Sequence, residues 1–386
     1  MSLPSWCSNP SKYTVLKATL LILFIIVNVF LYTQSKYAIF MDILPRIGIN
    51  FSVAVVTNTV NGSSSSSSFT YVPQYNIFNN FTNVPATTNS QTTQALIVPK
   101  IKFENPFTNE NVVNPHSFRY IITPNVTCTD RDVELVICVP ISQDNYKGRT
   151  VIRNTWGSYA YNVTNKAILI FFIGSNLNPE QVTTDKQLSE SAQYGDILQE
   201  DYIDCYNNLS LKSVSILKWV SSFCSNAKFV LKADDDMYVN IPFMITTLRK
   251  YITDAPTKDA FIVGSVQNNA HPIRSSSSKW YTPFKLYPDS TYPKYVSGTA
   301  YAMTVKAAFL LYEASLRVPI FWLEDVYITG LCARKGKVDV NHSGYFSYGK
   351  PGASGCSFRQ HISGHRYSHQ EILNIHKELY DVNLQC

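Results

Sequence analysis

The sequence predicts an α/β domain with a mostly parallel central sheet, behind an N-terminal transmembrane helix and a polar stem. Three observations predict this organisation: an uncharged apolar stretch near the N-terminus, a region rich in Asn, Ser and Thr, and short apolar runs that alternate with amphipathic stretches from residue 129 onward. At 386 residues, the chain is long enough for one large domain with accessory segments.

The apolar stretch, residues 18–32, is predicted to be a transmembrane signal anchor. It contains no charged residue, and Lys12 and Lys17 precede it without any acidic residue upstream. The residues that follow from Gln34 lack the small-residue pattern of a cleaved signal peptide. The positive-inside bias therefore predicts a cytoplasmic tail at residues 1–17 and a lumenal location for the rest of the chain.

Residues 33–128 are predicted to be a lumenal stem. They are rich in Asn, Thr and Ser, include the run Ser63 to Ser68, and lack sustained periodicity, which is typical of a tether. The folded domain is expected at residues 129–386.

Composition limits the partners and the redox chemistry of the chain. The net charge of +6 comes with only 16% charged residues and no basic run interleaved with aromatics, which argues against nucleic acid as a partner. Eight cysteines in a lumenal chain indicate disulfides, and with Cys7 on the cytoplasmic side an odd number remains, so at least one thiol is free or intermolecular. Possible N-glycosylation sites, several of which such a composition produces by chance, begin at Asn50, Asn61, Asn80, Asn125, Asn162, Asn208 and Asn341.

Strands and helices are expected to alternate from residue 134 onward. Strands are predicted at ELVICVPIS (134–142), AILIFFIG (167–174) and KFVLKA (228–233), and helices at residues 145–157, 179–193 and 209–224. This alternation indicates a mostly parallel sheet, whose ligands bind outside the carboxyl ends of the strands.

The stretch FVLKADDDMYVN (229–240) places three aspartates at one such strand end. In an extended segment alternate side chains share a side, so Asp234 and Asp236 should point together and Asp235 away. Two carboxylates on one side suit a cation such as Mg²⁺ or Mn²⁺, which completes its shell with phosphates and water. A solvated acidic turn is the alternative.

From about residue 134 the chain resembles the β1,3-glycosyltransferase family that contains galactosyl- and N-acetylglucosaminyltransferases of the secretory pathway. Six stretches in the family's order carry the resemblance: RTVIRNTWG (149–157), FFIG (171–174), YGDILQEDYIDCYNNLSLKS (194–213), FCSNAKFVLKADDDMYVN (223–240), YPKYVSGTAYAMT (292–304) and EDVYITG (324–330). The resemblance implies a single-pass type II Golgi membrane protein with a lumenal catalytic domain of the GT-A type. It further implies a UDP-sugar donor, a glycan acceptor on glycoprotein or glycolipid, Mn²⁺ or Mg²⁺, and inversion at the anomeric carbon.

The resemblance also implies roles for individual residues. It makes Asp325 the base that takes the acceptor's proton, with Glu324 as the alternative, and His365 a third metal ligand beside Asp234 and Asp236. Donor-binding residues would be Arg149, Arg153, Lys232, Asp234 and Asp235, although helix-surface arginines and a structural ion pair of Lys232 are the alternatives. The family pattern suggests that Cys332 pairs with Cys356.

Two stretches depart from the family pattern. The segment Glu324 to Gly330 carries one extra residue before its glycine, which alters the local helix register. The tail motif H-Q-x-S-P-E-E is present as HRYSHQE (365–371), without the proline and one acid.

Two other functions compete with a transferase. A Ca²⁺-dependent carbohydrate-binding module would have an all-β texture and no second carboxylate motif, and a catalytically inactive scaffold of the same fold would assist an active partner. The sequence leaves the choice of galactose or N-acetylglucosamine open, because these sugars differ in few groups.

Overall fold

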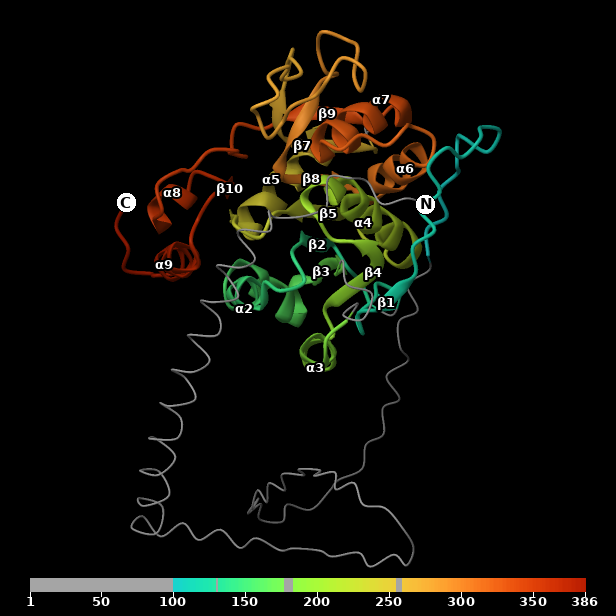
Figure 1. The fold of residues 1–386 in the computed structure, drawn as a ribbon. Helices are drawn as coiled ribbons and strands as arrows, with labels where there is room; N and C mark the ends of the chain where they lie inside the picture. Colours follow the sequence, from blue (N-terminus) through green and yellow to red (C-terminus); the bar gives the residue numbers. More distant parts are fainter. Residues whose placement is uncertain (1–99, 130, 177–182, 255–258) are drawn as a thin grey trace, which may run out of the picture. The chain divides into compact units, whose positions relative to one another are not determined.

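The computed structural model describes residues 100–129, 131–176, 183–254 and 259–386 (Figure 1). The predicted tail, the anchor at 18–32, most of the predicted stem and the sequons at Asn50, Asn61 and Asn80 lie outside these residues. Within them, no helix combines the length and apolar character needed to cross a membrane. Of the remaining sequons, Asn125 and Asn162 are exposed, whereas Asn208 and Asn341 are half-buried.

A mixed sheet forms the centre of the described domain. Eight strands lie in the order β1-β4-β3-β2-β5-β8-β7-β9, and β6 and β10 form a separate antiparallel pair. The strands are β1 (Tyr120–Ile122), β2 (Leu135–Pro140), β3 (Ala167–Ser175), β4 (Ile197–Ile203), β5 (Phe229–Ala233), β6 (Tyr238–Val239), β7 (Phe261–Gln267), β8 (Tyr295–Thr304), β9 (Asp339–His342) and β10 (Ser363–Gly364).

The predicted parallel sheet holds for its central strands only. Strands β4, β3, β2 and β5 are parallel, as the alternation of strands and helices predicted. Beyond β5, strand β8 runs antiparallel to β5, and β7 runs antiparallel to β8. The whole sheet is therefore mixed. No strand is predicted from the sequence beyond residue 240, so the directions of β7 and β8 were not predicted.

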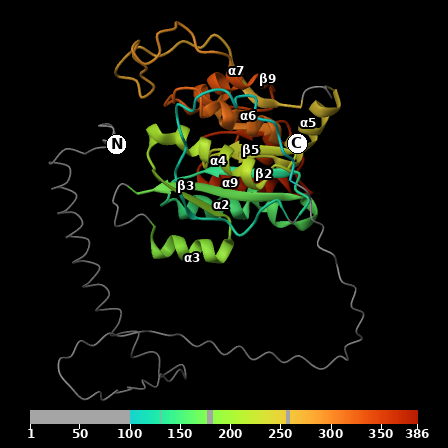
Figure 2. The same cartoon turned by 90° about the vertical axis from the view of Figure 1, so that its right-hand side faces the viewer.

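Helices cover both faces of the sheet. They are α2 (Tyr146–Asn154), α3 (Asp185–Tyr194), α4 (Leu209–Phe223), α5 (Ile241–Asp254), α6 (Val305–Ser315), α7 (Ala333–Gly336), α8 (Gly355–Phe358) and α9 (His369–Leu379). Side chains of β2 alternate between two cores: Val136 and Cys138 pack with α4 and α6, and Ile137 packs with α2, α5 and α9. Figure 2 shows α6 and α7 on one side of the strands and α2 on the other.

Packed structure begins upstream of residue 129, the predicted start of the domain. Strand β1 pairs antiparallel with β4, and Phe107 is buried in the core. A disulfide between Cys128 and Cys224 ties this segment to the end of α4. The last part of the predicted stem, from residue 100, is therefore part of the folded unit.

The predicted pairing of Cys332 with Cys356 is wrong. Cys356, in α8, forms a disulfide with Cys386 across a separation of 30 residues. Cys332 is a fully buried thiol in the hydrophobic core, and burial raises its pKa. A cysteine enclosed by one core cannot reach a partner in another part of the fold.

Candidate active site

Two neighbouring cavities open at the carboxyl ends of the parallel strands. The larger has a volume of about 650 Å³ and the smaller about 500 Å³. Both are lined by Pro140, which ends β2, and by Asp234, which follows β5. This is the place where open α/β sheets bind their ligands, as the sequence predicted.

All three aspartates of the acidic triplet line the smaller cavity, and Asp234 and Asp236 also line the larger one. Asp234 and Asp236 thus share a cavity as predicted, although Asp235 and Asp236 lie in a turn and not in the extended segment that the sequence predicted. Asp234 accepts a hydrogen bond from Lys232 at 2.7 Å, and Asp236 lies 3.5 Å from His365. Asp234 and Asp236 thus have specific partners, but the triplet lies in a turn and these two side chains are 37% and 44% exposed, so the structure keeps features of the alternative, a solvated acidic turn.

Lys232 lies between the acidic triplet and the carboxylate pair Glu324–Asp325. Its buried ammonium lies 2.7 Å from Asp234 and 3.6 Å from the Oε2 atom of Glu324, and it donates to the Gly298 carbonyl at 2.5 Å. Burial raises the pKa of Asp234 to about 7 against the opposing charge of Lys232. The ion pair predicted as an alternative role for Lys232 is present, and the residue also lines the larger cavity.

The adjacent carboxylates Glu324 and Asp325 have different surroundings. Glu324 is buried, and its Oε1 atom accepts hydrogen bonds from Ser213 at 2.8 Å and Tyr301 at 2.7 Å. Asp325 is half-buried, and among the described residues its hydrogen-bond donors are two backbone N–H groups, those of Val326 and Gly298. Burial, followed by the charge of Glu324, raises the pKa of Asp325 to about 6.

Gly298 allows this carboxylate pair to approach strand β8. A Cβ atom built at residue 298 would lie 2.8 Å from Glu324 Oε2 and 3.2 Å from the Cβ atom of Asp325. Any larger residue would push the carboxylates away from the strand.

Comparison with known proteins identifies the family. Residues 147–344 match the model of the galactosyltransferase family. The chain is 37% identical over 267 residues to human beta-1,3-galactosyltransferase 1, a match that covers 69% of this chain and 80% of the relative. The chain belongs to the galactosyltransferase family. It is also 35% identical over 260 residues to lactosylceramide 1,3-N-acetyl-beta-D-glucosaminyltransferase of Xenopus tropicalis, covering 64% of this chain and 67% of that protein.

This membership confirms the resemblance drawn from the six stretches and makes the chain a glycosyltransferase. A solved galactosyltransferase in complex with donor and acceptor sugar analogues has a TM-score of 0.33 and 10% identity, with 64% of this chain and 97% of that chain covered. That similarity is too low to bear on fold or function.

The residues expected to hold a metal in this galactosyltransferase-family site fit the ion only in part. Asp236 and His365 face each other and combine a carboxylate with an imidazole, a donor set suited to Mn²⁺. Burial lowers the pKa of His365, so the ring is neutral near pH 7 and available as a ligand. Asp234 is engaged by Lys232, and the described residues contain no group of three His, Cys, Asp or Glu gathered for a metal.

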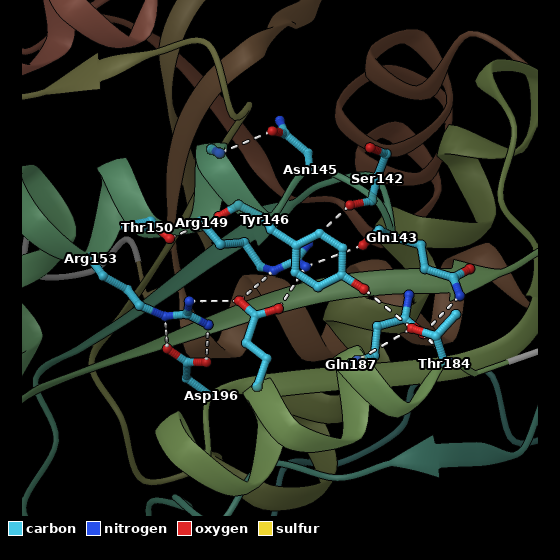
Figure 3. Close-up of polar contacts among 12 residues, drawn as sticks. Ser142, Gln143, Asn145, Tyr146, Arg149, Thr150, Arg153, Thr184, Gln187 and Asp196 are labelled. Carbon is cyan, nitrogen blue, oxygen red and sulfur yellow. Dashed lines mark hydrogen bonds and ion pairs between the residues drawn. The ribbon is translucent and has the colours of Figure 1, made fainter. Parts of the chain in front are cut away.

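The expectation that Arg149 and Arg153 contact the donor is corrected by their burial. Both guanidinium groups lie beneath helix α2 (Figure 3), and neither side chain lines either of the two cavities described above. Glu190 binds Arg149 at 2.7 Å and Arg153 at 2.7 Å, and Asp196 binds Arg153 at 2.7 Å. Two buried acids neutralise two buried arginines, so neither donor contact nor the alternative, a position on the helix surface, describes these side chains.

The extra residue in the segment Glu324 to Gly330 is absorbed by a π-helix, η6 (Val326–Cys332). Such turns accommodate one additional residue within a helix. Asp325 remains at the start of this helix, where its side chain caps the Val326 N–H, so the altered register does not move it out of the cavity.

Sequence reasoning missed most of the aromatic and basic lining of the larger cavity. Two cations at its wall, Lys279 and Arg366, form no ion pair within the described parts of the chain, and Arg366 has a positive φ of 67°. The aromatic lining residues are Tyr206, Trp280, Tyr292, Tyr295, Trp322 and Tyr348. Arg366 follows His365 in the tail motif, which was the only local signal for its position.

Proposed function

We propose that this galactosyltransferase-family member is an inverting, metal-dependent β1,3-glycosyltransferase. It moves galactose or N-acetylglucosamine from a UDP-sugar to a hydroxyl group of a glycan on protein or lipid. Relatives named as a beta-1,3-galactosyltransferase and as a lactosylceramide N-acetylglucosaminyltransferase support this substrate class. The observation that carries the proposal is the contrast between Glu324 and Asp325.

Asp325 is the general base in this proposal. Its carboxylate borders the larger cavity and has a pKa of about 6, so it is ionised near neutral pH and still basic enough to take a proton. Glu324 is occupied by Ser213 and Tyr301 and serves to hold Lys232 in place. The choice between the two carboxylates that the sequence left open therefore favours Asp325.

In this proposal the donor diphosphate binds near Asp236 and His365. These residues would hold Mn²⁺ or Mg²⁺ together with phosphate oxygens and water, and Asp234 would join them if it released Lys232. When bound, the cation supplies positive charge for the leaving diphosphate. The aromatic wall of the larger cavity offers flat apolar surfaces for the acceptor sugar.

The family and the apolar stretch 18–32 also support a type II Golgi membrane topology with a lumenal catalytic domain. This arrangement gives the catalytic domain access to glycoproteins and glycolipids in transit.

The test is a UDP-release assay with UDP-galactose, UDP-N-acetylglucosamine and UDP-N-acetylgalactosamine against a panel of neutral glycans. We expect acceptor-dependent release with one donor, and a β-linked product from the α-linked donor by NMR. A wild-type chain that binds UDP but releases none with any pair would instead be the inactive scaffold. Retention of the α-anomer would refute inversion.

A further inference from the structure

The loop after strand β2 forms one wall of the smaller cavity. All five residues from Pro140 to Asp144 line that cavity, together with Asp235 of the acidic triplet. This loop has no strand neighbour beyond Ile141, whose N–H donates to the Phe172 carbonyl at 3.1 Å. Other contacts must therefore define the shape of the wall.

Arg149 supplies two of these contacts from within the protein, beside those that Lys212 makes to the Ile141 carbonyl at 2.9 Å and Gln187 to the Gln143 side chain at 2.8 Å. Its side chain is fully buried, its Nη1 atom donates to the Ser142 carbonyl at 3.0 Å, and its Nη2 atom donates to the Gln143 carbonyl at 3.1 Å. The other side of the guanidinium is held by Glu190, at 2.9 Å from Nε and 2.7 Å from Nη2. Figure 3 shows Arg149 between helix α2 and the residues Ser142 and Gln143.

The same loop continues to the acidic triplet through Asn145. The Asn145 N–H donates to the Ser142 carbonyl at 3.1 Å, so this carbonyl joins Arg149 and Asn145. The Asn145 side chain caps α2 by accepting from the Gly148 N–H, and its amide donates to Asp235 at 2.6 Å. Arg149 is thus connected to Asp235 by three successive hydrogen bonds.

Gly148 is required for the last of these bonds. A Cβ atom at residue 148 would lie 2.5 Å from the Nδ2 atom of Asn145, which is closer than side chains approach. An alanine there would displace the amide from Asp235 while remaining compatible with the helix, because alanine is the better helix former.

We propose that Arg149 is a positioning residue for the nucleotide side of the donor site, which it shapes by fixing the loop 141–145 and, through Asn145, the side chain of Asp235. This inference rests on the proposed function, because it takes the ligand of the smaller cavity to be the nucleoside diphosphate of the donor. Loop carbonyls and a fixed carboxylate are acceptors for the N–H and hydroxyl groups of a nucleoside.

Arg153 provides a matched control within the same charge network. It shares Glu190 with Arg149 and is paired with Asp196, but it donates no hydrogen bond to the loop. A lysine at either position keeps the positive charge and loses the fork of donors. Of the two substitutions, only the one at residue 149 removes hydrogen bonds to the loop that lines the smaller cavity.

The experiment compares Arg149→Lys, Arg153→Lys and Gly148→Ala in the full-length protein. The measurements are the dissociation constant for UDP, with and without Mn²⁺, the melting temperature, and hydrogen exchange of the backbone amides of residues 141–145. We expect Arg149→Lys to weaken UDP binding about tenfold or more, as the loss of two charge-assisted hydrogen bonds predicts. Exchange in residues 141–145 should rise in this variant.

Arg153→Lys should lower the melting temperature and leave both UDP binding and loop exchange close to wild type. Gly148→Ala should weaken UDP binding. Because the added Cβ also crowds the capping oxygen of Asn145, its melting temperature should fall by no more than the loss of one helix cap, and the higher helix propensity of alanine offsets part of that loss. If Arg149→Lys and Arg153→Lys weaken UDP binding equally, or if Arg149→Lys leaves loop exchange unchanged, Arg149 only stabilises the fold and the inference is overturned. If the wild-type chain binds no UDP, the proposed function is refuted. Hydrogen exchange of residues 141–145 in Arg149→Lys would still show whether Arg149 holds this loop in place.

Discussion

Replacing the neighbouring carboxylates Glu324 and Asp325 one at a time should separate stability from catalysis. Asp325→Asn keeps the size of the side chain, and its remaining oxygen can still accept from the Val326 N–H. The change removes the charge that would take the acceptor's proton, so we expect turnover to fall by about 10² or more. Because the side chain is half-buried and forms no ion pair with any residue that the structure describes, the free energy of unfolding should change by less than about 1 kcal/mol.

Glu324→Gln should have the opposite effect. The buried carboxylate accepts from Ser213 and Tyr301 and lies 3.6 Å from Lys232, and a neutral amide leaves Lys232 with Asp234 as its remaining close carboxylate. Hydrogen bonds to charged groups contribute about 1.5–3 kcal/mol, so we expect a loss of about 2–3 kcal/mol. In a domain of this size, the melting temperature should fall by about 4–10 °C. Turnover should stay within about tenfold of wild type.

The assay measures initial rates of UDP release from pH 5 to 8, alongside thermal unfolding of each variant. In the wild type, kcat/KM should fall about tenfold for each pH unit below about 6, because protonated Asp325 cannot accept the proton. Full turnover by Asp325→Asn with an inactive Glu324→Gln would show that the base is the other carboxylate. Normal turnover by both variants would leave the inverting mechanism without a base.

Three further predictions concern the metal, the disulfides and the anchor. Asp236→Asn should weaken UDP-sugar binding, with partial recovery in excess Mn²⁺, and full activity in a chelator would contradict a metal requirement. Cys386→Ser should cost about 3–4 kcal/mol of stability, because it opens a loop of 30 residues, whereas Cys332→Ala should leave all disulfides intact in peptide maps. The full chain should partition with membranes, and a mature N-terminus between residues 33 and 60 in cell-associated protein would refute the uncleaved anchor.

The sequence predicted the place of the acidic triplet, which follows the end of strand β5 and lines the cavities there. The end of a buried strand can be recognised from its own apolar run, so this position could be predicted without knowledge of the fold. The conformation of the triplet could not, because Asp235 and Asp236 form a turn and not the expected extended segment.

Pairings between distant residues could not be obtained in this way. The acid that binds Arg149 is 41 residues away, and the acid that binds Arg153 most extensively is 43 residues away. Since nothing local distinguishes an arginine that faces a ligand from one that faces a buried carboxylate, the family pattern favoured the wrong role. The disulfide prediction failed for the same reason, because spacing contains no information about which core encloses Cys332.

The π-helix at Val326–Cys332 bears on how this chain tolerates changes in length. Thr329, which is completely buried in it, accepts a hydrogen bond from the N–H of Val296 in strand β8 at 2.8 Å, and its hydroxyl lies 3.0 Å from the Val296 carbonyl and 2.6 Å from the Asp325 carbonyl. Thr329 of the π-helix thus attaches the helix that begins at Asp325 to strand β8, which contains Gly298. Deleting one residue from the π-helix would restore an ordinary helix but would break this hydrogen bond beside the proposed base. The extra residue is therefore difficult to lose.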